Sequence, residues 1–164
     1  MSTETPAKTG YKAPWSKSLK GISWGFTILI LGLVVFASRP KINPVVAIPL
    51  GILLLAAPFT IRGYRITPDA LRVHRLFWDT TVPLAELQSA EFNPTAMKGS
   101  TRTGGNGGLF YFSGYFSNKA LGEYRALVTN PALSVVLQFP AGTIVVSPES
   151  PETFVQTILA LAKR

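Results

Sequence analysis

Two long stretches without a charged residue lie close together near the amino terminus, and they restrict the fold more than any other feature. The first covers the eighteen residues Gly21–Ser38 and the second the twenty residues Ile42–Ile61. Since a helix rises about 1.5 Å per residue, each run spans roughly 27–30 Å, close to the hydrocarbon core of a bilayer. Neither run has the polar stripe of a surface helix. The two runs therefore predict two transmembrane helices.

The link between the runs is short and contains two prolines and an asparagine, Pro40, Asn43 and Pro44. Such a link breaks a helix and turns the chain, so the two helices are expected to form an antiparallel hairpin over residues 21–61. Two other interpretations compete. A remainder of about a hundred residues is too small to bury two such helices on all sides. A signal peptide cleaved after Val35-Phe36-Ala37 is disfavoured because a second apolar run follows at once.

The net charge of +8 is concentrated beside the apolar runs. Residues 1–20 are predicted to be a basic tail, the short link adds two cations, and four arginines follow the second run: Lys8, Lys12, Lys17 and Lys20; Arg39 and Lys41; Arg62, Arg65, Arg72 and Arg75. By the positive-inside rule both termini of this integral membrane protein are expected in the cytoplasm. This distribution also argues against nucleic acid as a partner.

The two runs contain no Asp, Glu, Lys, Arg or His. Ion pathways and proton relays normally need such groups within the membrane, so the hairpin is expected to be an anchor or a docking surface. The chain has no cysteine, which excludes disulfides and thiolate metal sites.

After the membrane segment the hydrophobic pattern changes to a period of two residues, as in β-strands. Strands are expected in segments separated by turns such as Pro68-Asp69 and Pro140-Ala141-Gly142, in the order of an antiparallel meander: 64–67, 71–76, 78–84, 87–92, 124–129, 133–139 and 143–147. The chain ends in a predicted amphipathic helix. Ser150 is suited to its N-cap and Pro151 to its first position, and its apolar face comprises Phe154, Val155, Ile158, Leu159, Leu161 and Ala162.

Several motifs of this second part resemble a known family. They are Tyr64-Arg65-Ile66-Thr67-Pro68-Asp69-Ala70-Leu71-Arg72-Val73, Val82-Pro83-Leu84, Arg102 to Phe110, Gly114-Tyr115-Phe116, Leu121-Gly122-Glu123-Tyr124 and Gly142 to Pro148. Together they are similar to bacterial membrane-associated proteins with a PH-like domain, over residues 62–164. The resemblance implies a mainly β, partly open barrel with one carboxyl-terminal helix. It brings no catalytic residues and no cofactor.

No enzyme signature is present. The stretch Gly99–Gly108 lacks the Lys-Ser/Thr pair that a phosphate-binding loop needs, and it is expected to be a flexible loop between strands. His74 is the only histidine and has no acid close in the sequence, so we expect a solvated strand residue. The acids are scattered singly, which does not favour acid–base catalysis. No metal site and no cofactor are predicted.

The segment Asn93–Gly122 is the candidate interaction edge. Its aromatic residues can be core residues, or they can form a binding patch beside nearby cations. The candidate binding residues are Lys98, Arg102, Phe110, Tyr111, Tyr115 and Phe116. The expected role is a membrane-anchored scaffold that binds a protein partner or a second copy of itself. The alternative is a module for lipid or a small ligand, which would use Arg62, Arg65, Lys98 and Arg102. The short loop Thr67–Ala70 has no cation to bind a headgroup.

Overall fold

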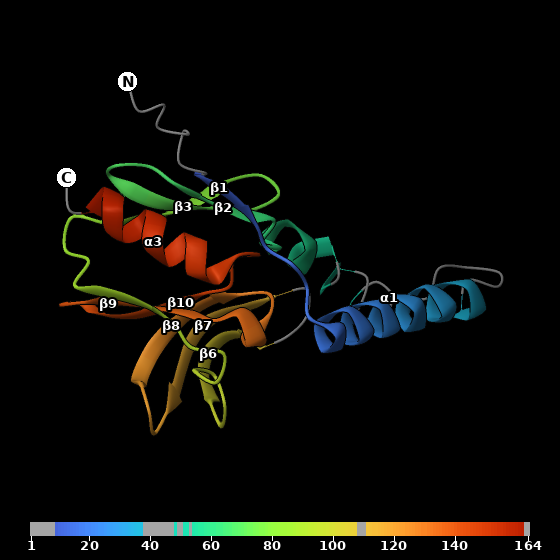
Figure 1. The fold of residues 1–164 in the computed structure, drawn as a ribbon. Helices are drawn as coiled ribbons and strands as arrows, with labels where there is room; N and C mark the ends of the chain where they lie inside the picture. Colours follow the sequence, from blue (N-terminus) through green and yellow to red (C-terminus); the bar gives the residue numbers. More distant parts are fainter. Residues whose placement is uncertain (1–8, 38–47, 49–50, 53, 108–110, 163–164) are drawn as a thin grey trace.

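The computed structural model describes residues 9–37, 48, 51–52, 54–107 and 111–162. Figure 1 shows two β-sheets with a helix at one end, and a long helix, α1, that projects away from them. The elements are β1 (Gly10–Lys12), α1 (Lys17–Ala37), η1 (Ala57–Phe59), β2 (Gly63–Ile66), β3 (Ala70–His74), β4 (Asp79–Pro83), β5 (Ser89–Phe92), β6 (Thr101–Gly107), β7 (Phe112–Asn118), β8 (Gly122–Val128), η2 (Pro131–Leu133), β9 (Val135–Phe139), β10 (Gly142–Val146) and α3 (Pro151–Ala162).

Helix α1 begins where Ser16 accepts a hydrogen bond from the backbone N–H of Leu19 through its hydroxyl oxygen, at 3.1 Å. It buries a narrow stripe that includes Leu19, Ser23 and Ile30, while most of its large apolar side chains are exposed, Ile28 by 65%. A helix in the core of a soluble protein would bury these side chains. In the described part of the chain, α1 is the one helix long and apolar enough to cross a membrane.

Within the second predicted membrane helix, Ile42–Ile61, residues 42–47, 49, 50 and 53 lie outside the described residues. Within it, residues 48, 51, 52 and 54–56 are helical, and η1 follows them. The amino-terminal helix of the predicted hairpin is therefore present. The pairing of two helices stays a prediction.

The first sheet has the order β1-β2-β3-β4 and is antiparallel throughout. Strand β1 was not predicted, because Gly10–Lys12 lies in the segment interpreted as a basic tail. It pairs with β2, with Tyr11 opposite Tyr64. Tyr11 is 4% exposed, so this segment contributes to the core of the domain that follows the membrane segment.

The second sheet has the order β5-β9-β10-β8-β7-β6. The prediction of an antiparallel meander is wrong for several neighbours: β10 pairs with β8 in parallel, β5 pairs with β9, and β4 and β5 lie in different sheets. Strands β9 and β10 form the expected hairpin, but β10 inserts between β9 and β8. The connection through η2 carries the chain past β10. Strand periodicity cannot reveal such an insertion, because it does not depend on which neighbour a strand has.

The glycine-rich stretch is also different from the prediction of a flexible loop. Residues Thr101–Gly107 form β6, which pairs with β7, with an irregularity between Arg102 and Gly104. At this pair the backbones approach closely: a Cβ on Gly105 would lie 2.6 Å from Cα of Gly114, and Gly105 has a φ of 85°. Gly104, Gly105 and Gly107 are therefore part of a tightly packed strand pair.

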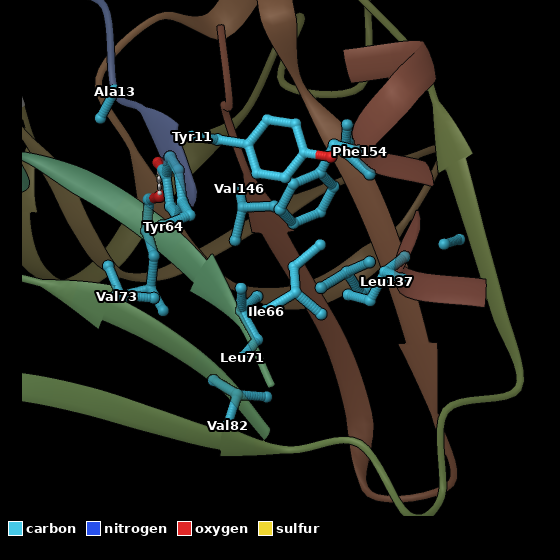
Figure 2. Close-up of a cluster of buried hydrophobic side chains, with 14 of the residues drawn as sticks. Tyr11, Ala13, Tyr64, Ile66, Leu71, Val73, Val82, Leu137, Val146 and Phe154 are labelled. Atoms are coloured by element: carbon cyan, nitrogen blue, oxygen red, sulfur yellow. Dashed lines mark hydrogen bonds between the residues drawn. The ribbon is translucent and has the colours of Figure 1, made fainter. Parts of the chain in front are cut away.

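The main core lies between the two sheets and under α3. Figure 2 shows Tyr11, Tyr64 and Phe154 meeting above the aliphatic residues Ile66, Leu71, Leu137 and Val146. The ring of Phe154 packs edge-on against Tyr11 at 5.1 Å and Tyr64 at 6.3 Å. The predicted helix and its buried face, with Phe154 and Ile158 fully buried, are confirmed. The mainly β domain with a carboxyl-terminal helix is confirmed as well.

A second, smaller core covers the other face of the second sheet. It contains Phe116, Tyr124, Val136 and Val145, and the connection between β5 and β6 covers it with Ala96. Asn118 holds this connection by donating to the carbonyl of Ala96 at 2.7 Å. The segment before β6 is thus packed against the sheet.

Candidate interaction site

A groove of about 660 Å³ opens between the edge of the first sheet and the inner face of the second. Its floor follows the strand register: Tyr115 on β7 is opposite Arg125 on β8, and Arg125 is opposite Ile144 on β10. The wall is the end of β4 and the residues after it. The groove is lined by Val82, Pro83, Ala85, Glu86, Tyr115, Glu123, Tyr124, Arg125, Phe139, Ala141, Gly142, Thr143 and Ile144.

The groove lies where the inner face of the second sheet is left uncovered. The first sheet and α3 bury Leu137 and Val146 on this face, and Tyr64 and Arg75 reach β8 and β7 farther along it. Towards β7 the same face carries Arg125, which is half-buried, and Tyr115, which is 61% exposed. Apolar and aromatic surface therefore continues from the core into an open groove.

The charged groups of the groove have both signs. Arg125 lies in the floor between the apolar side chains, and Glu86 and Glu123 contribute carboxylates to the lining. Such a mixture of apolar surface with a few charges is typical of protein–protein contact surfaces. The two acids oppose the binding of an anionic headgroup.

Arg75, directly after β3, connects the end of the apolar segment to both sheets. Its guanidinium donates to the carbonyl of Phe59 at 2.6 Å, to the hydroxyl of Thr80 at 3.0 Å and to the hydroxyl of Ser113 at 3.2 Å. It also lies 5.6 Å from the ring centre of Tyr111. This side chain connects η1, β4 and β7 at one point.

Burial lowers the pKa of Arg75; Tyr111 opposes this shift, and the positive charge of Arg125 adds to it. A guanidinium remains charged at neutral pH even so, and Arg75 donates the three hydrogen bonds described above as a cation. Sequence reasoning counted Arg75 only as a cation that flanks a membrane helix. Two of its partners are distant in sequence: Phe59 is sixteen residues away and Ser113 is thirty-eight residues away. No local pattern could therefore have revealed this role.

The predicted binding residues do not form one site. Lys98, Arg102 and Tyr115 are exposed, whereas Tyr111 and Phe116 are buried at 6% and 5% exposure. Phe110 lies outside the described residues. Arg102 is opposite Phe116, so it lies on the face of the sheet that Tyr115 does not share. Of the described residues in this set, the structure brings Tyr115 into the groove.

Sequence reasoning missed most of the groove, including Arg125, Ile144 and the wall from β4. Alternation along β8 does place Glu123 and Arg125 on the same face as the buried Leu127. That pattern is a weak signal, and it does not reveal which strands meet there.

His74 was expected to have no acidic partner, and this was wrong. Its Nδ1 lies 2.7 Å from a carboxylate oxygen of Asp79, its neighbour across the β3–β4 hairpin. Both side chains are about one-third exposed, so the pair contributes little to stability. Among the described residues, no group of three or more histidine or acidic side chains is placed to hold a metal ion.

Comparison with known proteins agrees with the architecture. The family model of the bacterial PH domain matches residues 62–162, more than half of the chain, from the start of β2 to the end of α3. No curated protein and no solved structure matches the chain. The match covers β2 to β10 and the carboxyl-terminal helix, with β1 outside it, and it confirms the resemblance read from the sequence. The chain therefore belongs to the bacterial PH domain family.

Proposed function

We propose that this chain is a membrane-anchored, non-catalytic interaction module whose PH-like domain binds a protein partner or a second copy of itself through the groove. PH domains are in general binding modules, which gives the coarse function. The observation that carries the finer proposal is the groove itself. It combines an exposed tyrosine, Tyr115, with apolar surface and with charges of both signs.

A membrane hairpin is supported by the pairing of β1 with β2. These strands lie on either side of the apolar segment in the sequence, yet they are hydrogen-bonded neighbours, with Tyr11 opposite Tyr64. A single membrane crossing between them would place them on opposite sides of the bilayer. The chain must therefore cross an even number of times. With α1 as one crossing, the run Ile42–Ile61 is proposed as the other.

The orientation follows from the cations near the helix ends. Lys17 and Lys20 at the start of α1 and Arg62 before β2 are exposed, on the side of the membrane that carries the domain. This arrangement agrees with the positive-inside rule and favours a cytoplasmic domain with both termini in the cytoplasm of a bacterial inner membrane.

The alternative is a lipid or small-ligand module using Arg62, Arg65, Lys98 and Arg102. Arg65 lies on β2 and Arg102 on β6, in different sheets, while Arg62 precedes β2 and Lys98 lies in the connection before β6. The four cations therefore do not share one strand or loop. Arg102 also donates to the carbonyl of Gly105 at 2.8 Å. The turn between β2 and β3 is closed by a 2.9 Å hydrogen bond from Thr67 to Ala70, which leaves no open headgroup loop. These observations favour protein over lipid in the groove.

Photocrosslinking in intact membranes tests the proposal. A photoreactive phenylalanine analogue in place of Tyr115 should give a discrete protein adduct, and the charge reversal Arg125→Glu should reduce it. The same analogue at the exposed position Gln156 on α3 is the matched control. An adduct of twice the chain mass identifies self-assembly. Lipid adducts alone, or equal adducts at both positions, contradict protein binding in the groove.

A further inference from the structure

The turn between β3 and β4 exposes three consecutive large apolar residues. Leu76, Phe77 and Trp78 are 42%, 75% and 40% exposed. In the described part of the chain from residue 60 onward, the only other exposed large apolar side chain is Tyr115 in the groove. A monomeric soluble domain rarely presents such a contiguous group of apolar side chains. We therefore expect another surface to cover these side chains.

Strand register places this turn at the membrane end of the domain. His74, the last residue of β3, is opposite Gly63, the first residue of β2. The backbone N–H of Leu76 donates to the carbonyl of Pro58 at 3.2 Å. The ring of Trp78 packs edge-on against Phe59 at 4.7 Å. The turn thus lies beside the point where the chain leaves its apolar segment.

The turn is also held firmly. The backbone N–H of Arg75 donates to the carbonyl of Trp78 at 3.0 Å, which closes the turn. The guanidinium of Arg75 fixes its base to Phe59, Thr80 and Ser113. An apolar surface held in place in this way is preorganised for contact, since little conformational freedom remains to be lost.

We propose that Leu76, Phe77 and Trp78 insert into the headgroup–acyl boundary of the same leaflet from which α1 emerges, as a second membrane contact. Aromatic side chains favour this boundary, and the exposed Lys17, Lys20 and Arg62 suit anionic lipids. The acid beside the turn, Asp79, faces His74. The inference rests on the membrane anchoring proposed above and adds a site to it.

The second contact fixes the orientation of the groove. Strand β4 starts at Asp79, beside the turn, and ends at Pro83, in the groove wall. Strand β8 likewise begins in the groove and ends near the start of α1, where the carbonyl of Thr129 accepts from the backbone N–H of Ser16 at 3.1 Å. The groove therefore opens at the end of the domain that points away from the bilayer, where a soluble partner reaches it.

Because the chain has no cysteine, a single spin label tests the contact in the complete protein. Phe77→Cys places the label in the turn. Ala120→Cys, exposed between β7 and β8 at the opposite end, is the matched control. Both variants are reconstituted into vesicles of phosphatidylcholine and phosphatidylglycerol. Collisions with oxygen, which concentrates in lipid, are compared with collisions with a water-soluble nickel chelate.

The expected result is a label at position 77 that collides with oxygen and is protected from nickel, with the opposite result at position 120. A label at position 77 as accessible to nickel as the control overturns the inference. Protection from both reagents also overturns it, because protein then covers the turn. Flotation of the vesicles separates the two proposals. Chain that floats with lipid but has a water-exposed label contradicts only the second contact, whereas chain that alkaline carbonate releases contradicts the anchor and with it this contact.

Discussion

Tyr64 and Arg75 are polar side chains that the fold places between its two sheets, and each joins parts of the chain that are distant in sequence. The hydroxyl of Tyr64 donates to the carbonyl of Leu127 at 2.8 Å and accepts from the backbone N–H of Ser147 at 3.1 Å. Arg75 joins η1, β4 and β7 by donating hydrogen bonds to all three. A buried polar group that loses such partners costs about 1–3 kcal/mol, so these residues specify how the sheets pack.

The role of Tyr64 predicts a pH dependence. Burial raises the pKa of Tyr64 to about 12 from an ordinary value of 10.0. The folded state therefore retains the phenolic proton where the unfolded state loses it, and the stabilisation present below pH 10 is lost as pH rises towards 12. One pKa unit corresponds to about 1.4 kcal/mol, so the loss amounts to roughly 2–3 kcal/mol.

Tyr64→Phe isolates this contribution. The phenol titrates between about pH 9 and about pH 12. Over this range the free energy of unfolding should fall more steeply for the natural chain than for the variant. Urea unfolding of the full chain in detergent micelles measures both. Parallel pH profiles would show that the pKa of Tyr64 does not differ between the folded and unfolded states, contrary to this prediction.

At the scale of elements, the pairing of β6 with β7 shows how composition can mislead. Five glycines between residues 99 and 108 reduce the propensity for regular structure, and a flexible loop was the expectation. The strand forms because its partner also has a glycine at the closest approach, where Gly105 is opposite Gly114. Two side chains would not fit there, so the glycines are a requirement of the pair.

Gly105→Ala should therefore destabilise the domain more than Gly122→Ala. Both glycines have positive φ, 85° and 67°, and a side chain there costs about 1–2 kcal/mol through the backbone alone. A Cβ at Gly122 meets no atom within 4 Å, whereas one at Gly105 meets Cα of Gly114 at 2.6 Å. Overpacking adds roughly 1–3 kcal/mol at Gly105. Thermal unfolding of the two variants gives the comparison, and equal midpoints would remove the close approach as a cause.

At the scale of the whole molecule, the segment before the apolar helix α1 belongs to the domain after it. Residues 1–20 were interpreted as a basic tail, yet β1 completes the first sheet. The hydroxyl of Tyr11 lies 2.9 Å from that of Thr157 on α3. The carbonyl of Lys12 accepts from the backbone N–H of Glu149 at 3.0 Å. The domain is therefore complete only when the residues before the apolar segment pack against the residues after it.

This closure predicts different effects for two neighbouring residues. Tyr11→Ala removes a buried aromatic ring that packs against Phe154, and it should lower the free energy of unfolding by roughly 3–5 kcal/mol. Lys12→Ala alters an exposed side chain on the same strand and should stay within about 0.5 kcal/mol of the natural chain. Equal stability of the two variants in micelles would show that residues 9–12 do not contribute to the stability of the domain.

The features that sequence reasoning predicted depend on local pattern. The strands of 64–92 and 124–147, the helix from Pro151 and the face with Phe154 and Ile158 follow from hydrophobic period, turn residues and caps, which act within a few residues. The amino-terminal apolar helix can also be predicted from the sequence, because its length and lack of charge are visible without knowing which segments it contacts. The resemblance to bacterial PH domains rested on motifs in these same segments.

The features that sequence reasoning missed depend on which distant segments meet. The groove and the contacts of Arg75 with Phe59 and Ser113 follow from strand order and register. The aromatic cluster of residues 110–116 shows the difference well. Composition indicated that some rings are buried and others exposed, but only the pairing of β7 with β8 buried Phe116 and left Tyr115 in the groove.

The sequence by itself thus determined an apolar, membrane-type helix followed by a mainly β domain with a terminal helix, because period, charge and length are local properties of the chain. The tertiary structure decided that β1 joins the domain although the apolar segment separates them in sequence, that β10 lies between β8 and β9, and where the groove opens. Those outcomes depend on burying one shared core and on satisfying backbone hydrogen bonds between strands far apart in sequence. No local window of residues contains that information.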